Sequence, residues 1–177
     1  LIPCPTFSEY ENAVRFFGGK IIHFKSLNIR DDFSNFIKKI PKNGIIFLCN
    51  PNNPTGELLS KKFVQEVVKT AEKRSTLVFL DETFVELVPD SKPSLVKTVN
   101  THENLIILRS FTKSFGLAGL RIGYAVGSKK IIQILQKIKI PWNVNYIAQS
   151  AANAALCYSN FLEKSRKNIK KENIFLM

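Results

Sequence analysis

The sequence predicts an α/β fold in which a mostly parallel sheet is sandwiched by helices. Four short apolar runs lack the alternation of half-buried strands, and such continuous runs are typical of strands buried on both faces. The first two runs flank a stretch with helical periodicity, which indicates a β-α-β unit. The 177 residues are 45% hydrophobic and include 14 Phe, enough to fill the core of one globular domain.

The elements follow one another without a repeat or a clear linker. A helix is expected from Ser8 to Phe17, ended by two glycines, and a strand from Ile21 to Phe24. The apolar runs predict strands at 45–49, 77–80, 105–108 and 122–126. Between the first two of these, Ser60 can cap a helix whose apolar face carries Phe63, Val64, Val67, Val68 and Ala71. Further helices are expected at 129–139, 143–158 and 161 to about 174, with a break at Pro141.

Charge, hydropathy and cysteine content argue against several classes of function. The net charge of +12 comes largely from cationic residues at helical spacing after residue 128, which solvated helix faces explain. No nucleic-acid-binding signature accompanies this charge, so nucleic acid is not an expected partner. There is no signal peptide and no apolar run of the roughly 20 residues that span a bilayer, so we expect a cytoplasmic protein without membrane contact. The three cysteines have neither metal-ligand nor disulfide spacing, and no metal site is predicted.

Polar side chains follow three of the predicted strands, at the carboxyl ends where ligands of such sheets bind. The first strand is followed by "NPNNPTG", whose prolines and glycine fix an irregular turn and whose Asn53 can direct an amide inward. The groups after the other two strands are Asp81, Ser110, Thr112 and Lys113, with Arg121 eight residues further on. Taken singly, these residues are also what a turn or a helix cap would use.

One ligand accounts for all of these groups together: an aromatic ring with a protonated nitrogen, a phenolic oxygen, an aldehyde and a phosphate. Lys113 would form a Schiff base with the aldehyde, Asp81 would pair with the ring nitrogen, and Asn53 would hydrogen-bond the phenolic oxygen. The phosphate ligands would be Ser110, Thr112 and Arg121. A Walker P-loop is the other interpretation of "SFTKSFG", but the GxxxxGK[ST] order is missing.

The motifs "NPNNPTG", "FLDETF" and "RSFTKSFGLAGLRIGY", in this order and at these separations, resemble the fold-type I pyridoxal-phosphate enzymes of the class I and II aminotransferase group. The resemblance covers essentially the whole chain. It implies the large domain of that fold, pyridoxal 5'-phosphate as the cofactor and a homodimer when the protein is full length. It makes Lys113 the lysine that carries the cofactor, and it assigns the ring nitrogen to Asp81 and the phenolic oxygen to Asn53. The phosphate ligands that it implies are Ser110 and Arg121, with Thr112 beside them.

Two phenylalanines belong to the same comparison. The opening "PTFSEY" resembles the family segment whose aromatic residue stacks on the cofactor ring, which places Phe7 on the pyridine face; a core Phe is the alternative. Where the aminotransferases usually carry a tyrosine three residues after the aspartate, this chain has Phe84. The substitution removes a hydrogen bond to the phenolic oxygen.

The resemblance also divides the chain. Residues 1–140 would form the cofactor-binding large domain, incomplete at its N-terminus, and residues 141–177 would be helices leading toward an absent C-terminal small domain. The start at Leu1 instead of an initiator methionine agrees with a fragment. The family's substrate-carboxylate arginine and a further phosphate loop would then lie outside this chain. Asn145 would either contribute near the substrate or begin a helix.

Two branches of the group come into question: the threonine-phosphate decarboxylases of the cobalamin pathway and the histidinol-phosphate aminotransferases of histidine biosynthesis. Phe84, "LRSFTK" and "PWNVN" favour the decarboxylase, whereas "FGLAGLRIGY" is common among the aminotransferases, which stay the alternative together with other class I and II members. Either enzyme acts on a small phosphorylated amino acid or amine. A catalytically silent relative that keeps the fold is the rival hypothesis, although such a protein has no need of Lys113 and Asp81.

Overall fold

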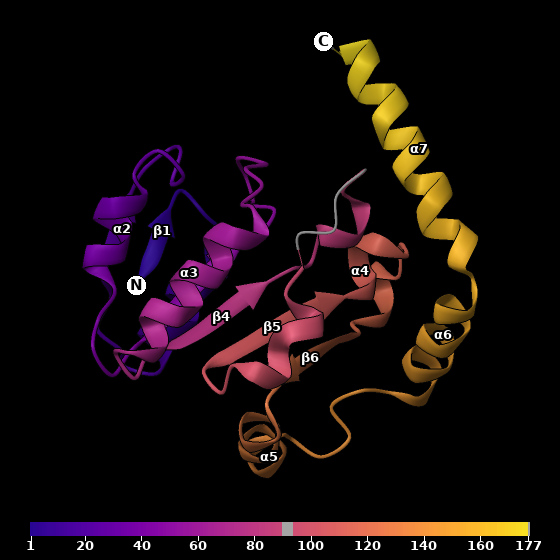
Figure 1. Cartoon of the computed structure of the whole chain (residues 1–177). Helices are drawn as coiled ribbons and strands as arrows, with labels where there is room; N and C mark the ends of the chain where they lie inside the picture. The colour runs from indigo at the N-terminus through magenta and orange to yellow at the C-terminus, as the bar shows by residue number, and fades with distance from the viewer. Residues whose placement is uncertain (90–93, 177) are drawn as a thin grey trace.

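The computed structural model describes residues 1–89 and 94–176 and confirms the α/β fold (Figure 1). The first half contains β1 (Ile2–Cys4), α1 (Glu9–Phe16), β2 (His23–Lys25), α2 (Phe33–Lys39), β3 (Ile45–Cys49), α3 (Lys61–Glu72) and β4 (Leu77–Asp81). The second half contains the 3-10 helices η1 (Val85–Leu87) and η2 (Val96–Thr101), β5 (Leu105–Ser110), α4 (Phe111–Ser114), η3 (Ala118–Leu120), β6 (Gly123–Gly127), α5 (Lys129–Ile138), α6 (Tyr146–Cys157) and α7 (Ser159–Leu176).

The sheet is mostly parallel, as predicted. Its main part has the order β3-β4-β5-β6, in which β3, β4 and β5 are parallel and β6 is antiparallel to β5. The register pairs Asp81 at the end of β4 with Cys49 on one side and Leu108 on the other. The parallel pair β1-β2 joins this sheet through Leu1, whose amino group donates to Ile45 O at 2.7 Å and whose carbonyl accepts from Phe47 N at 3.1 Å.

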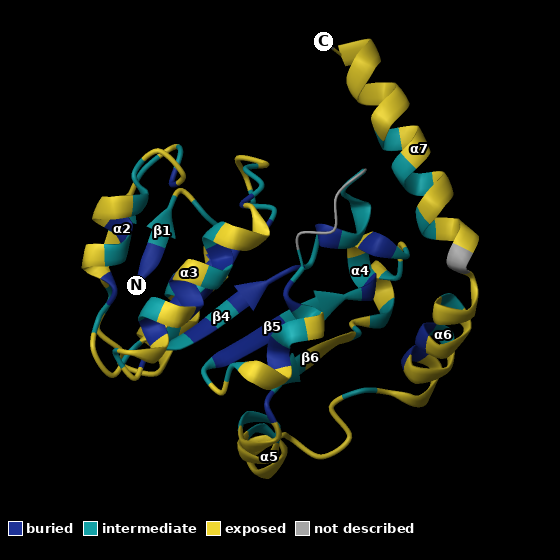
Figure 2. Ribbon diagram, viewed as in Figure 1, coloured by how far each residue is buried: buried dark blue, intermediate teal, exposed yellow. Residues whose placement is uncertain are grey.

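Helices cover both faces of the sheet, because side chains alternate along each strand. One face carries six buried aliphatic residues that pack against α2, α3 and η2: Ile46, Leu48, Val78, Leu80, Leu105 and Ile107. On the opposite face, Phe47 and Phe79 pack with Tyr10 and Val14 of α1. Figure 2 shows β4 and β5 buried or half-buried along their length, in agreement with their apolar runs. The burial expected for the run 122–126 is wrong, because β6 lies at the edge of the sheet and is largely exposed.

The helix α3 forms where the sequence predicts it. Ser60 caps its first turn, the side-chain oxygen accepting from Phe63 N at 3.1 Å, and Val64, Val67, Val68 and Ala71 are completely buried. The sequence analysis predicted neither β1 nor α2. Each is too short for a periodic pattern, since β1 has three residues and α2 has seven.

The helices of the C-terminal part form as predicted, with ends that differ by one to three residues, most at the start of α6. The helix expected from residue 143 begins at Tyr146, because Asn145 is its N-cap and accepts from Ala148 N at 2.8 Å. Figure 1 shows α7 extending away from the sheet. Near its start α7 is fastened by Arg166, which donates to Glu86 O at 2.9 Å, and by Phe161, which stacks on Phe115.

No helix in the described ranges is both long and apolar enough to cross a bilayer. The division at residue 140 stays a prediction, and Met177, at the end of the predicted second region, lies outside the described residues.

Candidate functional site

Adjacent strands bring two of the predicted site residues to one face of the sheet. Asp81 ends β4 and Ser110 ends β5, and alternation along the strands directs both side chains to the face that carries α1. The Asp81 carboxylate accepts a hydrogen bond from the Tyr10 hydroxyl at 2.7 Å, which confirms this direction. Ser110 caps the short helix α4, its oxygen accepting from Thr112 N at 3.1 Å. The carboxyl ends of the strands therefore present an acid and a hydroxyl on the same face, with Ser110 two residues beyond the register partner of Asp81.

The opposite face of the same two strand ends is fixed by a buried ion pair. Arg109 Nη2 lies 2.8 Å from Glu82 Oε2, and the two side chains are 9% and 0% exposed. Arg109 also donates to Glu86 Oε1 at 3.1 Å and to Ser94 Oγ at 2.8 Å, and Ser94 in turn donates to Glu82 Oε2 at 2.7 Å. Because Glu82 follows Asp81 and Arg109 precedes Ser110, this network sets the spacing of the two site residues.

Asp81 is a buried acid without a cationic partner in the described part of the chain. Its two carboxylate oxygens accept from neutral donors, Tyr10 Oη at 2.7 Å and Thr83 N at 2.9 Å. Burying a charge is costly unless an opposite charge accompanies it. The geometry thus suits a ligand that brings a cation to Asp81.

The lysine of the site is available for chemistry. Lys113 lies on α4 directly after Thr112, and its side chain is exposed. Within the described residues, its amine forms neither an ion pair nor a hydrogen bond. A solvent-accessible amine without a partner can react with a carbonyl group.

A cavity of about 390 Å³ brings the three predicted phosphate ligands together. Ser110, Thr112 and Arg121 line it, together with Thr83 and Tyr124. Arg121 has a φ of 52°, a left-handed conformation that is uncommon for arginine and is found at functional sites, and its guanidinium donates to Ala118 O at 2.9 Å. The lining of this cavity does not include the other predicted site residues, which are Phe7, Asn53, Asp81, Phe84 and Lys113.

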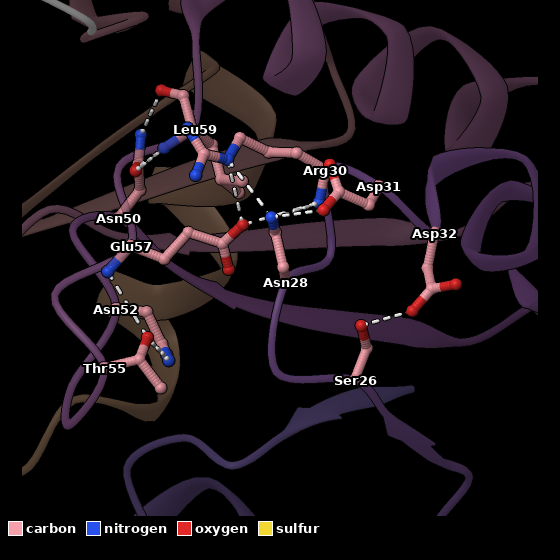
Figure 3. Close-up of polar contacts among 10 residues, drawn as sticks. All are labelled: Ser26, Asn28, Arg30, Asp31, Asp32, Asn50, Asn52, Thr55, Glu57 and Leu59. Carbon is pink, nitrogen blue, oxygen red and sulfur yellow. Dashed lines mark hydrogen bonds and ion pairs between the residues drawn. The ribbon is translucent and has the colours of Figure 1, made fainter.

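The "NPNNPTG" turn is held rigidly at several points. Asn50 is buried and exchanges hydrogen bonds with the backbone of Leu59, at 2.8 and 3.2 Å (Figure 3). Asn52 donates to Thr55 Oγ1 at 2.8 Å and to Pro5 O at 3.0 Å. These contacts leave the side-chain amide of Asn53, half-buried, without a hydrogen bond among the described residues.

The turn is also tied to the segment that carries Phe7. Thr6 Oγ1 donates to Asn52 Oδ1 at 2.7 Å, so the two segments keep a fixed separation. Phe7 is 42% exposed, which does not fit a core residue and leaves part of its ring accessible to a ligand. Its edge contacts Tyr10, with ring centroids 5.6 Å apart.

Sequence reasoning missed several residues that build the site. Tyr10 hydrogen-bonds Asp81, and Asn52 joins two loops. Both residues lie inside motifs from which the sequence predicts only other residues, Phe7 and Asn53, as ligands. Their role depends on contacts 71 and 46 residues away in the chain, which no local pattern reveals. The ion pair of Glu82 and Arg109 likewise joins residues far apart in the chain, 27 positions, so no local pattern reveals it. Asn145, left open as a substrate contact or a helix start, is the N-cap of α6.

Comparison with known proteins agrees with this geometry. Residues 1–177 match the family described as "Aminotransferase class I and II". Histidinol-phosphate aminotransferase 2 of Archaeoglobus fulgidus is 40% identical over 172 residues, which are 97% of this chain and 48% of that protein. The chain spans about half the length of the curated relatives it matches.

Solved structures share the fold. The histidinol-phosphate aminotransferase from Clostridium acetobutylicum superposes with a TM-score of 0.84 at 31% identity, covering 97% of this chain and 52% of that one. The L-threonine-O-3-phosphate decarboxylase from Porphyromonas gingivalis has a TM-score of 0.77 at 29% identity, covering 91% of this chain and 47% of that one.

Breaking the buried ion pair should destabilise the protein strongly. Arg109→Met leaves Glu82 buried without its cation, so we expect the free energy of unfolding to fall by about 3–5 kcal/mol. Lys167→Met, which removes one member of the exposed pair with Glu163, is the matched control and should change it by less than about 0.5 kcal/mol. Urea unfolding of the full-length variants measures both values. Equal losses in the two variants would contradict the role given to Arg109.

Proposed function

Because the chain belongs to the aminotransferase class I and II family, we propose that it forms the cofactor-binding part of a pyridoxal-phosphate-dependent enzyme. The observation that carries the proposal is the buried Asp81, held by two neutral donors at the carboxyl end of β4. A protonated pyridine nitrogen supplies the cation that this acid lacks. The donor set around it fits the remaining groups of the same cofactor.

Each residue has a distinct task in this proposal. Asp81 keeps the ring nitrogen protonated, and the half-buried amide of Asn53 donates to the phenolic oxygen. The exposed amine of Lys113 would hold the cofactor through its aldehyde. Phe7 covers one face of the ring. The phosphate is bound by Ser110, Thr112 and Arg121, which already converge on one cavity.

The bound cofactor supplies an electron-accepting ring, and the protein decides how strongly the ring accepts electrons. Asp81 has this role, because a negative charge held next to the nitrogen stabilises the protonated ring. Which bond of the substrate breaks depends on which one stands perpendicular to the ring plane. The residues that anchor the substrate therefore select the reaction.

We propose that the full-length enzyme decarboxylates threonine phosphate. Phe84 and "PWNVN" resemble the decarboxylase branch, and the solved decarboxylase from Porphyromonas gingivalis is one of the similar structures. Transamination of histidinol phosphate is the second candidate, favoured by relatives of that name and by "FGLAGLRIGY". Both substrates are small phosphorylated amino compounds.

We also propose that the full-length enzyme is a homodimer. The segment from the end of α5 to the start of α6 supports this: Ile138, Ile140, Trp142 and Tyr146 are between 72% and 96% exposed. Neighbouring exposed apolar side chains mark interaction surfaces, and a second copy would cover them. The cytoplasmic location expected from the sequence stays a prediction.

Borohydride reduction of the full-length protein loaded with pyridoxal phosphate should fix the cofactor on Lys113. Lys113→Ala should abolish both this labelling and turnover while leaving the fold intact, because the exposed amine forms no hydrogen bond or ion pair with the described residues. Lys130→Ala, which removes an exposed lysine of α5, is the control and should change neither. Peptide mass spectrometry locates the label, and a label on another lysine would refute the assignment.

Asp81→Asn and Arg121→Ala should lower activity in different ways, the first through kcat and the second through cofactor affinity. A neutral amide cannot hold the ring nitrogen protonated, so Asp81→Asn should lower kcat by roughly 10²–10³-fold, the range for losing one preorganised electrostatic contact. Arg121→Ala removes one charge-assisted contact to the phosphate and should weaken cofactor affinity by roughly tenfold or more. Measuring kcat at increasing cofactor concentrations distinguishes the two variants, since excess cofactor should restore the activity of Arg121→Ala but not that of Asp81→Asn. Restoration of both variants would contradict these roles.

The reaction is decided by supplying each substrate to the full-length enzyme. We expect carbon dioxide from threonine phosphate and no 2-oxoglutarate-dependent transamination of histidinol phosphate. Carbon dioxide and keto-acid formation are followed separately. Transamination without gas evolution would replace the decarboxylase by the second candidate.

A further inference from the structure

Tyr10, the second residue of α1, donates its hydroxyl to Asp81 Oδ2 at 2.7 Å. Both residues are buried, with 6% and 8% of their surfaces exposed. The contact joins residues 71 positions apart, and it lies on the face of the sheet that carries the candidate site. It is therefore an ordered interaction inside the protein and not a surface contact.

The ring of Tyr10 is held on three sides by other aromatic rings. It stacks on Phe47 with centroids 5.4 Å apart and an interplanar angle of 18°, and it meets Phe79 edge-on at 6.4 Å. Phe7, the residue expected on the cofactor ring, contacts it edge-on at 5.6 Å. Such contacts restrict rotation of the phenol, so its hydroxyl stays directed at Asp81.

The hydroxyl fixes the carboxylate without occupying it completely. Thr83 N donates to Oδ1 at 2.9 Å and Tyr10 donates to Oδ2, while a carboxylate has about four acceptor positions. One position on each oxygen thus stays available for a ligand. Hydrogen bonds donated to a carboxylate favour its ionised form.

We infer that Tyr10 is a positioning residue: its hydroxyl keeps the Asp81 carboxylate oriented toward the ring nitrogen of the cofactor, and its ring supports Phe7. The inference rests on the proposed function. It gives one side chain two separable effects, an electrostatic one through the hydroxyl and a packing one through the ring.

The phenol of Tyr10 is a neutral donor near neutral pH. Burial raises the pKa of Tyr10 well above its usual value, and the neighbouring Cys49 and the charge on Asp81 raise it further. A neutral phenol donates to Asp81 throughout the neutral range and never adds a second negative charge to the site.

The effect of the Tyr10 hydroxyl is separated from that of its aromatic ring by comparing wild type and Tyr10→Phe, each with two ligands. The ligands are pyridoxal phosphate and its analogue in which CH replaces the ring nitrogen, each titrated calorimetrically into the full-length apoprotein. Without its hydroxyl partner, Asp81 is free to turn toward water in the apoprotein, and ligand binding must restore its orientation. Tyr10→Phe should therefore raise the dissociation constant of pyridoxal phosphate by about tenfold, and that of the analogue by less than about twofold.

Two further variants keep the test decisive. Phe47→Leu retains the phenol but loosens its packing, and it should weaken both ligands to the same degree. In an Asp81→Asn background, Tyr10→Phe should have no further effect on pyridoxal phosphate, because the hydroxyl acts through the carboxylate. If Tyr10→Phe folds poorly at room temperature, the titrations are made at low temperature. There the Asp81→Asn variant is compared with the double variant that carries both Asp81→Asn and Tyr10→Phe.

The outcomes are distinguishable. Equal weakening of both ligands by Tyr10→Phe, or an undiminished effect in the Asp81→Asn background, would overturn the inference and leave the proposed function standing. A wild-type protein that binds neither ligand would overturn the proposed function and this inference with it. The ¹⁵N chemical shift of the bound ring gives an independent readout, and in Tyr10→Phe it should move toward that of the unprotonated nitrogen.

Discussion

The spacing between the ends of β4 and β5 is the constraint on which the candidate site depends, and the ion pair of Arg109 with Glu82 maintains it. Backbone pairing continues to this point, since Glu82 N donates to Leu108 O at 3.0 Å, and the ion pair adds a side-chain contact between the same two strand ends. In this chain the alternation of side chains places the ion pair on one face and Asp81 with Ser110 on the other. One face thus supplies the rigidity that the other face uses for binding.

The two neighbouring acids, Asp81 and Glu82, show the difference between structural and functional burial. Glu82 is completely buried and is matched by Arg109, Ser94 and the backbone of Leu95. Asp81 is also buried, although slightly less than Glu82, but receives only neutral donors from the described residues. A protein retains such an unmatched charge at a cost in stability, which is expected where a ligand supplies the missing partner. The contrast within one dipeptide is a stronger indication of function than either acid alone.

The sequence predicted those parts of the fold that local patterns determine. The four apolar runs became β3, β4, β5 and β6 within two residues of their expected ends, and α3 followed from its apolar face and its Ser60 cap. The strand β1 and the helix α2 were missed because three and seven residues are too few to show a period. The site residues came from motifs and from a family resemblance, whereas Tyr10 and Asn52, which contact those motifs across the chain, could be found only from the structure.

The distribution of phenols around the site bears on the choice of reaction. Tyr10 places a hydroxyl beside Asp81, the acid proposed to pair with the ring nitrogen, whereas Phe84 has no hydroxyl to offer to the phenolic oxygen. Under the proposed function, such a pattern would act on the cofactor mainly through its ring nitrogen, which governs how well the ring accepts electrons and not which bond of the substrate breaks. Solved structures named for either activity resemble this chain to a similar degree, at 31% and 29% identity. Under the proposed function, the residues of the candidate site would account for what the two activities share, and the side chains that orient the substrate would determine how they differ.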